Sequence, residues 1–396
     1  MHGFDIKKKP FIIFWELTRA CMLACKHCRA KAQKKRHPDE LTTNEVFDVV
    51  EQITEFCEPY PLVVFTGGDP LMRDDVFEIV RYATSKRIRS AIAFSGTKLA
   101  TEDKLKELKK SGIARIAISL DGSNPEIHDH FRGVTGTFET SIEILNMAKE
   151  MDISRQINTT VTAFNIRDLP EIMKVGINNE VALWDVFFVV PTGRAKADYM
   201  PSSRDFEDVL NWLYDVGKLT PLNVKSSAAT HFRRIEYMRD SDIFYQGPGE
   251  LYMELKIELE KIRNEMGLRA EDKEVVAGAH GRSLAAKDGI QRRMGITDGR
   301  GMFFISHIGE VYPSGFLPIG AGNVRESKLK DIYMNSKIFQ DLKDPNKLKG
   351  KCGKCEFRFI CGGSRARAYA VYEDYLAPEP RCIYPTGEFK ELIAQE

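Results

Sequence analysis

Between residues 11 and 216, short apolar runs alternate with longer stretches of helical periodicity, and this alternation constrains the fold more than any other feature. Six runs predict strands: FIIFWEL, PLVVFT, SAIAFS, ARIAISL, RQINTTVT and LWDVFFVV. A stretch with apolar residues at helical spacing follows each run, and Thr42 with Glu45 can form a capping box at the first. Six βα units predict a parallel sheet with crossover helices, either doubly wound or curved into a barrel.

The βα alternation ends near residue 220. Residues 225 to 300 are rich in charge and contain one predicted helix, ELYMELKIELEKIRNEMG, with no further βα unit. Short strands and turns follow from residue 301. Because parallel α/β folds gather their active sites at the carboxyl ends of the strands, functional residues are expected there.

The composition is that of an ordinary globular protein, with 396 residues and a net charge of +1. Such a charge gives no reason to expect a nucleic acid or an anionic membrane as partner. The N-terminal segment lacks the apolar run of a signal peptide, and no run approaches the length of a membrane span. We therefore expect a cytoplasmic protein, in which clustered cysteines indicate metal binding or catalysis rather than disulfides.

Seven of the eight cysteines fall into two groups. The motif CMLACKHC places Cys21, Cys25 and Cys28 directly after the first predicted strand. Three thiolates can hold three irons of a 4Fe–4S cluster and leave the fourth iron open to a substrate, although a zinc ion with three cysteines and water has the same ligands. The remaining cysteine, Cys57, is expected to be a buried core thiol on the first helix.

The ends of the next strands carry further signals. FTGGDP follows the second strand, AFSGT ends the third, and ISLDG places Ser119 and Asp121 at the carboxyl edge of the fourth. Together with CxxxCxxC, the glycine pair and the Ser-Leu-Asp-Gly strand end, residues 11 to about 200 resemble the radical S-adenosylmethionine superfamily. The resemblance implies a partial (βα)6 TIM barrel.

The same resemblance implies the cofactor chemistry. An electron from the reduced cluster cleaves S-adenosylmethionine, and the 5′-deoxyadenosyl radical removes hydrogen from a substrate. Gly67 and Gly68 are implied to face the methionine amino group, with Asp69 where many relatives have glutamate. His27 is implied to lie against the adenine, and Ser119 and Asp121 near the ribose or carboxylate. Asn158, Thr160 and the segment VVPTG are implied to reach the nucleoside.

The second cysteine group consists of Cys352, Cys355, Cys361 and Cys382. Four thiolates close a site, so that a 4Fe–4S cluster here would serve electron transfer or structure, and a structural zinc has the same ligand count. The pattern resembles a reduced SPASM domain, because Ser314 and Arg365 stand where fuller versions have cysteines. This implies one auxiliary cluster in an α+β C-terminal domain.

The expected domains are a radical core at 1–220, a linker or insert bordering the substrate site at 221–300, and the auxiliary cluster domain at 301–396. The spacing resembles the radical enzymes of haem d1 and alternative haem synthesis, which implies an oxidoreductase acting on a modified tetrapyrrole. A maturase of ribosomally made peptides is the alternative, and an electron-transfer or scaffold protein is a third reading. A ferredoxin or flavodoxin is the expected electron donor.

Basic residues are the candidates for substrate binding, because arginine pairs well with the carboxylates of a tetrapyrrole. Four of them lie within KSSAATHFRRIEYMRD, and the fifth follows the fourth strand in DHFRG. A solvated basic helix face is the alternative for the first segment, and an ordinary surface arginine is the alternative for Arg132. The candidates are Arg132, Lys225, His231, Arg233 and Arg234.

Overall fold

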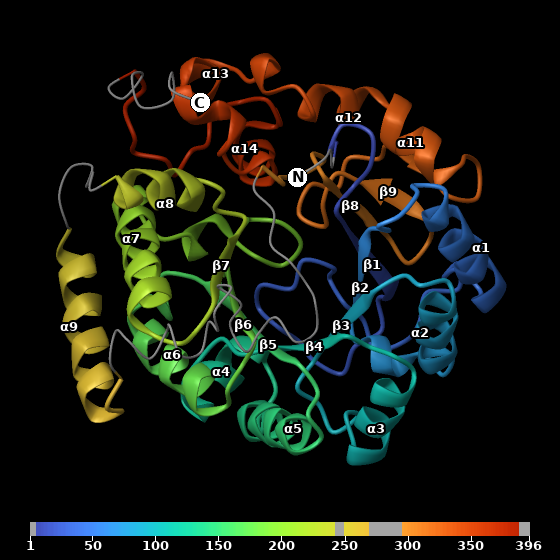
Figure 1. Cartoon of the computed structure of the whole chain (residues 1–396), viewed down its shortest axis with the longest axis horizontal. Helices are drawn as coiled ribbons and strands as arrows, with labels where there is room; N and C mark the ends of the chain where they lie inside the picture. Colours follow the sequence, from blue (N-terminus) through green and yellow to red (C-terminus); the bar gives the residue numbers. More distant parts are fainter. Residues whose placement is uncertain (1–4, 242–248, 269–294, 388–396) are drawn as a thin grey trace.

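The computed structural model describes residues 5–241, 249–268 and 295–387, and a ten-stranded sheet forms the centre of this part of the chain (Figure 1). The strand order is β10-β9-β8-β1-β2-β3-β4-β5-β6-β7. Strands β8 and β1 to β7 are parallel, whereas β9 and β10 join antiparallel at the edge. The strands are β1 (Ile12–Thr18), β2 (Leu62–Gly67), β3 (Ser90–Phe94), β4 (Arg115–Ser119), β5 (Arg155–Val161), β6 (Leu183–Phe188), β7 (Val224–Ser227), β8 (Met302–Ile305), β9 (Glu310–Tyr312) and β10 (Gly322–Asn323).

The helices between the strands cover the outer side of the curved sheet (Figure 1). They are α1 (Thr43–Thr54), α2 (Val76–Ser85), α3 (Glu102–Lys110), α4 (Pro125–Arg132), α5 (Thr137–Glu150), α6 (Leu169–Asn178) and α7 (Ser203–Leu219). Short 3₁₀ turns lie at η1 (Pro70–Met72), η2 (Ile166–Asp168), η3 (Ala197–Tyr199), η6 (Pro345–Lys347) and η7 (Glu356–Phe359). A doubly wound sheet reverses its strand order and has helices on both faces, so the sequential order confirms the partial barrel.

Alternation along each strand divides the two faces of the sheet. In β1, Ile13 and Trp15 are fully buried and pack with Val46 and Val50 of α1 in the main hydrophobic core. Their neighbours in the strand point to the concave face, because successive side chains alternate. The capping box of Thr42 and Glu45 forms as predicted and begins α1.

The parallel alternation continues one unit beyond the end predicted near residue 220. Strand β7 pairs with β6, and α8 (Phe232–Asp240) follows it. The strand was missed because VKSS is short and three of its four side chains are only partly buried. The predicted charged helix is confirmed as α9 (Glu250–Glu265), which packs on α7. None of the described helices is long and apolar enough to cross a lipid bilayer.

The C-terminal region extends the barrel sheet and then crosses its end. Strand β8 pairs with β1, and the chain continues through α11 (Leu329–Asn335), α12 (Lys337–Leu342), α13 (Gly350–Lys354) and α14 (Arg365–Tyr372) toward α8 (Figure 1). Arg367 of α14 is fully buried, pairs with Glu379, and donates to the carbonyl oxygens of Phe188 and Ala228. Those carbonyls end β6 and follow β7, so Arg367 fixes the C-terminal region on the carboxyl ends of these strands.

The prediction for Cys57 was wrong. The thiol is exposed, and its residue has a φ of 61° beyond the end of α1 at Thr54. The helix ends three residues before the cysteine, so the helical spacing used to place it in the core does not apply. The boundaries expected at residues 220 and 300 stay predictions, and residues 269–294 of the expected linker lie outside the described residues.

Candidate active site and cluster centres

The loop after β1 presents three cysteine sulfurs to a common neighbourhood. Cys21 and Cys25 are buried and Cys28 is half-buried. Each sulfur has a donor: the Leu23 amide to Cys21 at 3.4 Å, the Arg132 guanidinium to Cys25 at 3.7 Å and the Ala32 amide to Cys28 at 3.3 Å. Burial raises the pKa of the Cys21 and Cys25 thiols, and the Arg132 charge beside Cys25 partly offsets this effect.

The glycine pair after β2 packs directly on this cysteine loop. The Gly68 amide donates to the Thr18 carbonyl at 2.7 Å, and the Asp69 amide donates to the Ala20 carbonyl at 2.7 Å. A Cβ on Gly68 would lie 2.3 Å from the Ala20 carbonyl oxygen and 2.6 Å from that of Arg19. Glycine is therefore required for close backbone contact with the cysteine loop.

Replacing Gly68 with alanine should displace the cysteine loop, because both atoms that the new Cβ meets are backbone oxygens. We expect the G68A protein to lose most iron from the N-terminal centre and to lose 5′-deoxyadenosine formation. Gly176→Ala is the matched control, since a Cβ there meets only side-chain carbons at 3.5 Å or more. Iron and sulfide analysis after anaerobic reconstitution measures the effect, and full iron content in G68A would contradict the assignment.

Asp69 is fully buried beside the glycine pair. One carboxylate oxygen accepts from the Leu71 amide at 3.0 Å, and the other accepts from the Thr97 hydroxyl at 3.2 Å. Burial raises the pKa of Asp69 to about 6. These contacts hold the loop that begins η1, which is the position expected for an acid after the glycine pair.

A buried charge cluster joins the cysteine loop to the ends of β4 and β5. The Arg132 guanidinium lies 2.5 Å from an Asp121 carboxylate oxygen, and the other oxygen accepts from the Thr160 amide at 2.7 Å. Burial alone would raise the pKa of Asp121, but the Arg132 charge brings it below its usual value. Arg132 is thus a buried partner of Asp121 and Cys25 rather than a surface arginine.

His27 completes this cluster. Its Nε2 lies 3.7 Å from the Asp121 carboxylate, and its ring stacks on Phe131 with centroids 4.3 Å apart. Burial lowers the pKa of His27 to about 4, so the ring is neutral near pH 7. The structure therefore brings Cys25 and His27 of the cysteine loop together with Asp121 and Arg132, which follow about 100 residues later in the sequence.

A row of polar side chains crosses the concave face of the sheet. The strand register aligns Ser119, Asn158, Asp185 and Lys225 on neighbouring strands. The Lys225 ammonium lies 2.7 Å from the Asp185 carboxylate. Sequence analysis missed Asp185, although an acid between the apolar residues of LWDVFFVV was the available signal.

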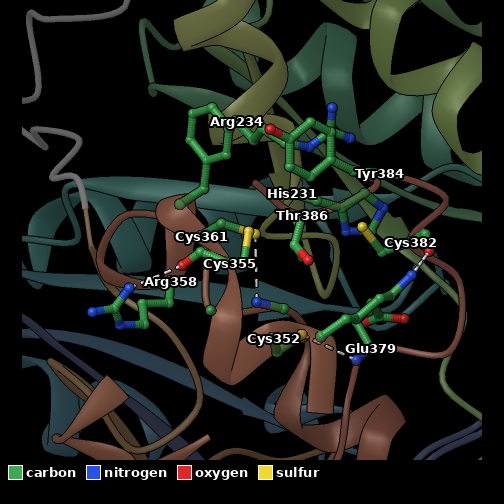
Figure 2. Close-up of a pocket in the computed structure, with 14 residues that line it drawn as sticks. His231, Arg234, Cys352, Cys355, Arg358, Cys361, Glu379, Cys382, Tyr384 and Thr386 are labelled. Carbon is green, nitrogen blue, oxygen red and sulfur yellow. Dashed lines mark hydrogen bonds between the residues drawn. The ribbon is translucent and has the colours of Figure 1, made fainter. Parts of the chain in front are cut away.

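The four C-terminal cysteines line one cavity with about 400 Å³ of empty space, its opening included (Figure 2). The Glu379 amide donates to Cys352 at 3.3 Å and the Gly363 amide to Cys361 at 3.4 Å. Burial raises the pKa of both the Cys355 and Cys382 thiols to about 12. In the described part of the chain, no three His, Cys, Asp or Glu side chains are arranged around a single metal ion.

Two residues predicted to contact substrate border this cavity instead. His231 is fully buried and Arg234 is 1% exposed, and both line the cavity with the cysteines. Arg233 donates to the Ile360 carbonyl at 3.3 Å. The segment after β7 therefore packs on the C-terminal cysteines, whereas Lys225, which lies within β7, belongs to the polar row on the sheet.

Comparison with known proteins matches two family models to the chain. The Radical SAM superfamily model covers residues 15–175, and the SPASM model, described as an iron–sulfur cluster-binding domain, covers residues 297–356. Arg365, at the position where the sequence resemblance expects another cysteine, lies 3.8 Å from the Cys352 sulfur. The three N-terminal and four C-terminal clustered cysteines, together with both family models, fit two 4Fe–4S clusters.

Relatives match over almost the whole chain. The AdoMet-dependent heme synthase of Methanosarcina barkeri is 36% identical over 96% of this chain and 98% of its own length. The mycofactocin maturase MftC of Mycobacterium tuberculosis is 26% identical, covering 98% of this chain and 86% of its own length. The solved structure of Streptococcus suis SuiB bound to S-adenosylmethionine has a TM-score of 0.67 at 14% identity, covering 95% of this chain and 78% of that one, and supports the fold. The chain belongs to the radical S-adenosylmethionine superfamily, as an enzyme that uses S-adenosylmethionine and two 4Fe–4S clusters in a partial barrel with a SPASM-type C-terminal region.

Proposed function

We propose that this enzyme removes hydrogen from a carboxylate-bearing side chain of a haem-type tetrapyrrole. The observation that carries the proposal is the 36% identity to an AdoMet-dependent heme synthase over nearly the full length of both chains. Sequence identity to the mycofactocin maturase is lower, at 26% compared with 36% for the heme synthase. A peptide substrate is therefore the alternative that the experiment below must separate.

The catalytic centre is assigned to the loop after β1. Cys21, Cys25 and Cys28 would hold a 4Fe–4S cluster, because each sulfur lies on one loop and accepts a hydrogen bond from a neighbouring N–H group. A cluster of this kind with S-adenosylmethionine supplies the 5′-deoxyadenosyl radical that removes hydrogen. The residues assigned to S-adenosylmethionine border this loop and the adjoining strand ends: His27, Gly67, Gly68, Asp69, Ser119, Asp121, Asn158 and Thr160.

Arg132 is assigned to this centre and not to the substrate. Its guanidinium spans the Cys25 sulfur at 3.7 Å and the Asp121 carboxylate at 2.5 Å, so it orients both. A buried charge pair of this kind loses about 3–5 kcal/mol of stability when one partner is removed. Arg132 therefore fixes the distance between the cysteine loop and the end of β4.

The concave face of the sheet offers features that suit a flat ring with carboxylates. Phe187 lies two residues from Asp185 on the same face, and its ring centroid lies 6.2 Å from that of Phe316. Lys225 supplies a cation within this surface and is partly exposed. We assign Lys225 to a substrate carboxylate, with Asp185 holding the ammonium in place.

The remaining assignments concern partners and location. The cluster requires an external electron, and a ferredoxin or flavodoxin is the proposed donor. No disulfide joins any of the eight cysteines, which suits a reducing compartment such as the cytoplasm. The described residues before α1 pack on the sheet and the C-terminal region, through the β1–β8 pairing and the Tyr333 hydroxyl that donates to the Ile6 carbonyl.

Turnover with defined substrates tests the proposal. Reconstituted enzyme, dithionite and S-adenosylmethionine are incubated anaerobically with iron-coproporphyrin or with a sirohaem derivative. We expect 5′-deoxyadenosine and a tetrapyrrole product that has lost a hydrogen atom and carbon dioxide from at least one side chain, detected by mass spectrometry. The electron that remains on the side chain would pass to the auxiliary cluster. Lys225→Met, which keeps the length of the side chain, should lower turnover at least about tenfold, the scale of one charge-assisted hydrogen bond. Unchanged tetrapyrrole mass with active 5′-deoxyadenosine formation would contradict a tetrapyrrole substrate and favour a peptide.

A further inference from the structure

The C-terminal cysteine cavity has one wall that comes from the barrel. Helix α8 contributes Arg234, and the segment just before it contributes His231, while the cysteines come from residues 352 to 382. Figure 2 shows Arg234 and Tyr384 at one end of the cavity and Cys352 and Glu379 at the other. The barrel and the C-terminal region thus build this centre together.

Arg234 is held rigidly at this wall. Its Nη2 donates to both carboxylate oxygens of Glu207 in α7, at 2.6 and 2.8 Å. Its guanidinium also lies 4.8 Å from the ring centroid of Tyr384, which lines the same cavity. Arg234 and Glu207 are 1% and 3% exposed, so water screens neither charge.

The two charges lie at different distances from the cysteines. Arg234 lines the cavity, whereas Glu207 lies behind it and is not part of the lining. The guanidinium remains charged at any relevant pH, because arginine is not deprotonated in proteins. The cavity therefore has a permanently charged guanidinium on its wall. The compensating carboxylate of Glu207 lies on the far side of Arg234, outside the lining of the cavity.

We propose that Arg234, held by Glu207, sets the reduction potential of the auxiliary cluster. This inference rests on the assignment of the four C-terminal cysteines to that cluster and is independent of the tetrapyrrole substrate. A cluster with four thiolates gains one negative charge on reduction, and a buried cation beside it stabilises the reduced form. Arg234 is thus a positioning residue that acts through its positive charge, and the negative charge of Glu207 partly cancels its effect on the cluster.

His231 supports an electrostatic role for this wall. Its side chain is fully buried, and within the described residues neither ring nitrogen has a hydrogen-bond partner. An imidazole without a partner is costly in an apolar interior, so a ring that faces the cysteine cavity suits a site that holds a polar group.

Redox titration of the holoenzyme, followed by the EPR signal of the auxiliary cluster, tests the proposal. In Arg234→Gln, the ratio of reduced to oxidised cluster at a fixed potential should fall at least about tenfold, which is about 59 mV for a one-electron couple. Glu207→Gln should shift the ratio in the opposite direction, because the opposing anion is removed. Arg234→Lys should stay near wild type, since the charge remains.

Arg239→Gln is the matched control. Arg239 also lies on α8 and pairs with α7 through Asp215 at 2.7 Å, but it does not line the cavity. The auxiliary cluster of the Arg239→Gln variant should have the same reduction potential as in wild type, although this variant also loses an ion pair between α7 and α8. A purely structural role for Arg234 predicts that both glutamine variants of the Arg234–Glu207 pair shift the potential in the same direction or not at all.

The outcomes are separable. Opposite shifts in Arg234→Gln and Glu207→Gln support the proposal, and equal potentials in both variants overturn it. Should Arg234→Gln lose the cluster, Glu207→Gln decides: a rise in the reduced fraction supports the proposal, and no rise overturns it. An auxiliary signal that persists in Cys382→Ala overturns this proposal together with the ligand assignment and leaves the tetrapyrrole assignment unaffected.

Discussion

Replacement of Cys21, Cys25 and Cys28 by alanine should remove about half of the roughly eight irons expected for two 4Fe–4S clusters. It should also reduce 5′-deoxyadenosine formation below detection. Both effects follow from the geometry, because the three sulfurs lie on one loop and each accepts a hydrogen bond from a neighbouring N–H group. The C-terminal cysteines lie in a separate cavity and should keep their iron.

The control for this variant is Cys57→Ala. Cys57 is exposed beyond α1 and contributes to neither centre, so its removal should leave both iron content and 5′-deoxyadenosine formation unchanged. Iron, sulfide and 5′-deoxyadenosine are measured on proteins reconstituted in parallel. A triple variant that still forms 5′-deoxyadenosine would show that the radical centre lies elsewhere.

Cys382→Ala should separate the two centres in the opposite way. Loss of the fourth ligand should abolish the EPR signal of the auxiliary cluster and lower product formation at least about a hundredfold, while cleavage of S-adenosylmethionine without product stays within about twofold of wild type. The reason is that a four-thiolate cluster depends on its complete ligand set. The cavity that Cys382 lines is formed by His231, Arg234 and residues between 351 and 386, and the loop of Cys21, Cys25 and Cys28 is not part of its lining.

The structure also limits where this variant loosens the chain. Residues 365–379 are fixed by Arg367, which pairs with Glu379 and reaches the barrel. Tyr384 donates to Glu356 at 2.5 Å and provides a second attachment further along. We therefore expect faster proteolysis only beyond about residue 380, within a tail that Glu356 still holds in part. An unchanged auxiliary EPR signal would remove Cys382 from the ligand set.

Local patterns predicted the parallel α/β sheet and the two cysteine groups, whereas the partial barrel and the iron–sulfur nature of both centres followed from the family resemblance. Strand and helix periodicity is visible along the chain, and cysteine spacing reflects how many thiolates one loop can present. The capping box at Thr42 and the helix at Glu250–Glu265 were predictable for the same reason. Strand β7 was missed because its four residues, one buried and three partly buried, carry too little periodicity.

The rest depends on which segments meet in space. The pairing of Asp185 with Lys225 is a consequence of strand register, which spacing along the chain does not determine. Arg234 was expected to contact a substrate because arginine pairs well with carboxylates and its segment follows the sixth predicted βα unit. Its side chain meets Glu207 and the C-terminal cysteines because the chain returns over the end of the barrel more than 100 residues later.

The glycine pair shows that one residue type can be required for two different reasons, which the sequence cannot separate. Sequence resemblance assigned Gly67 and Gly68 to the cofactor, whereas the structure adds a packing requirement against Ala20 and Arg19. Both roles call for glycine, so the residue type alone does not separate them. The G68A variant affects both, and its iron content reports the packing role.

The central claim is that a radical formed at the N-terminal centre takes hydrogen from a tetrapyrrole side chain. The most direct measurement uses iron-coproporphyrin deuterated in its carboxylate-bearing side chains and determines the mass of the 5′-deoxyadenosine that forms. The account predicts transfer of deuterium, so that 5′-deoxyadenosine becomes heavier in step with formation of the altered tetrapyrrole. If 5′-deoxyadenosine carries no deuterium although the tetrapyrrole is bound and the cofactor is cleaved, the claim is contradicted.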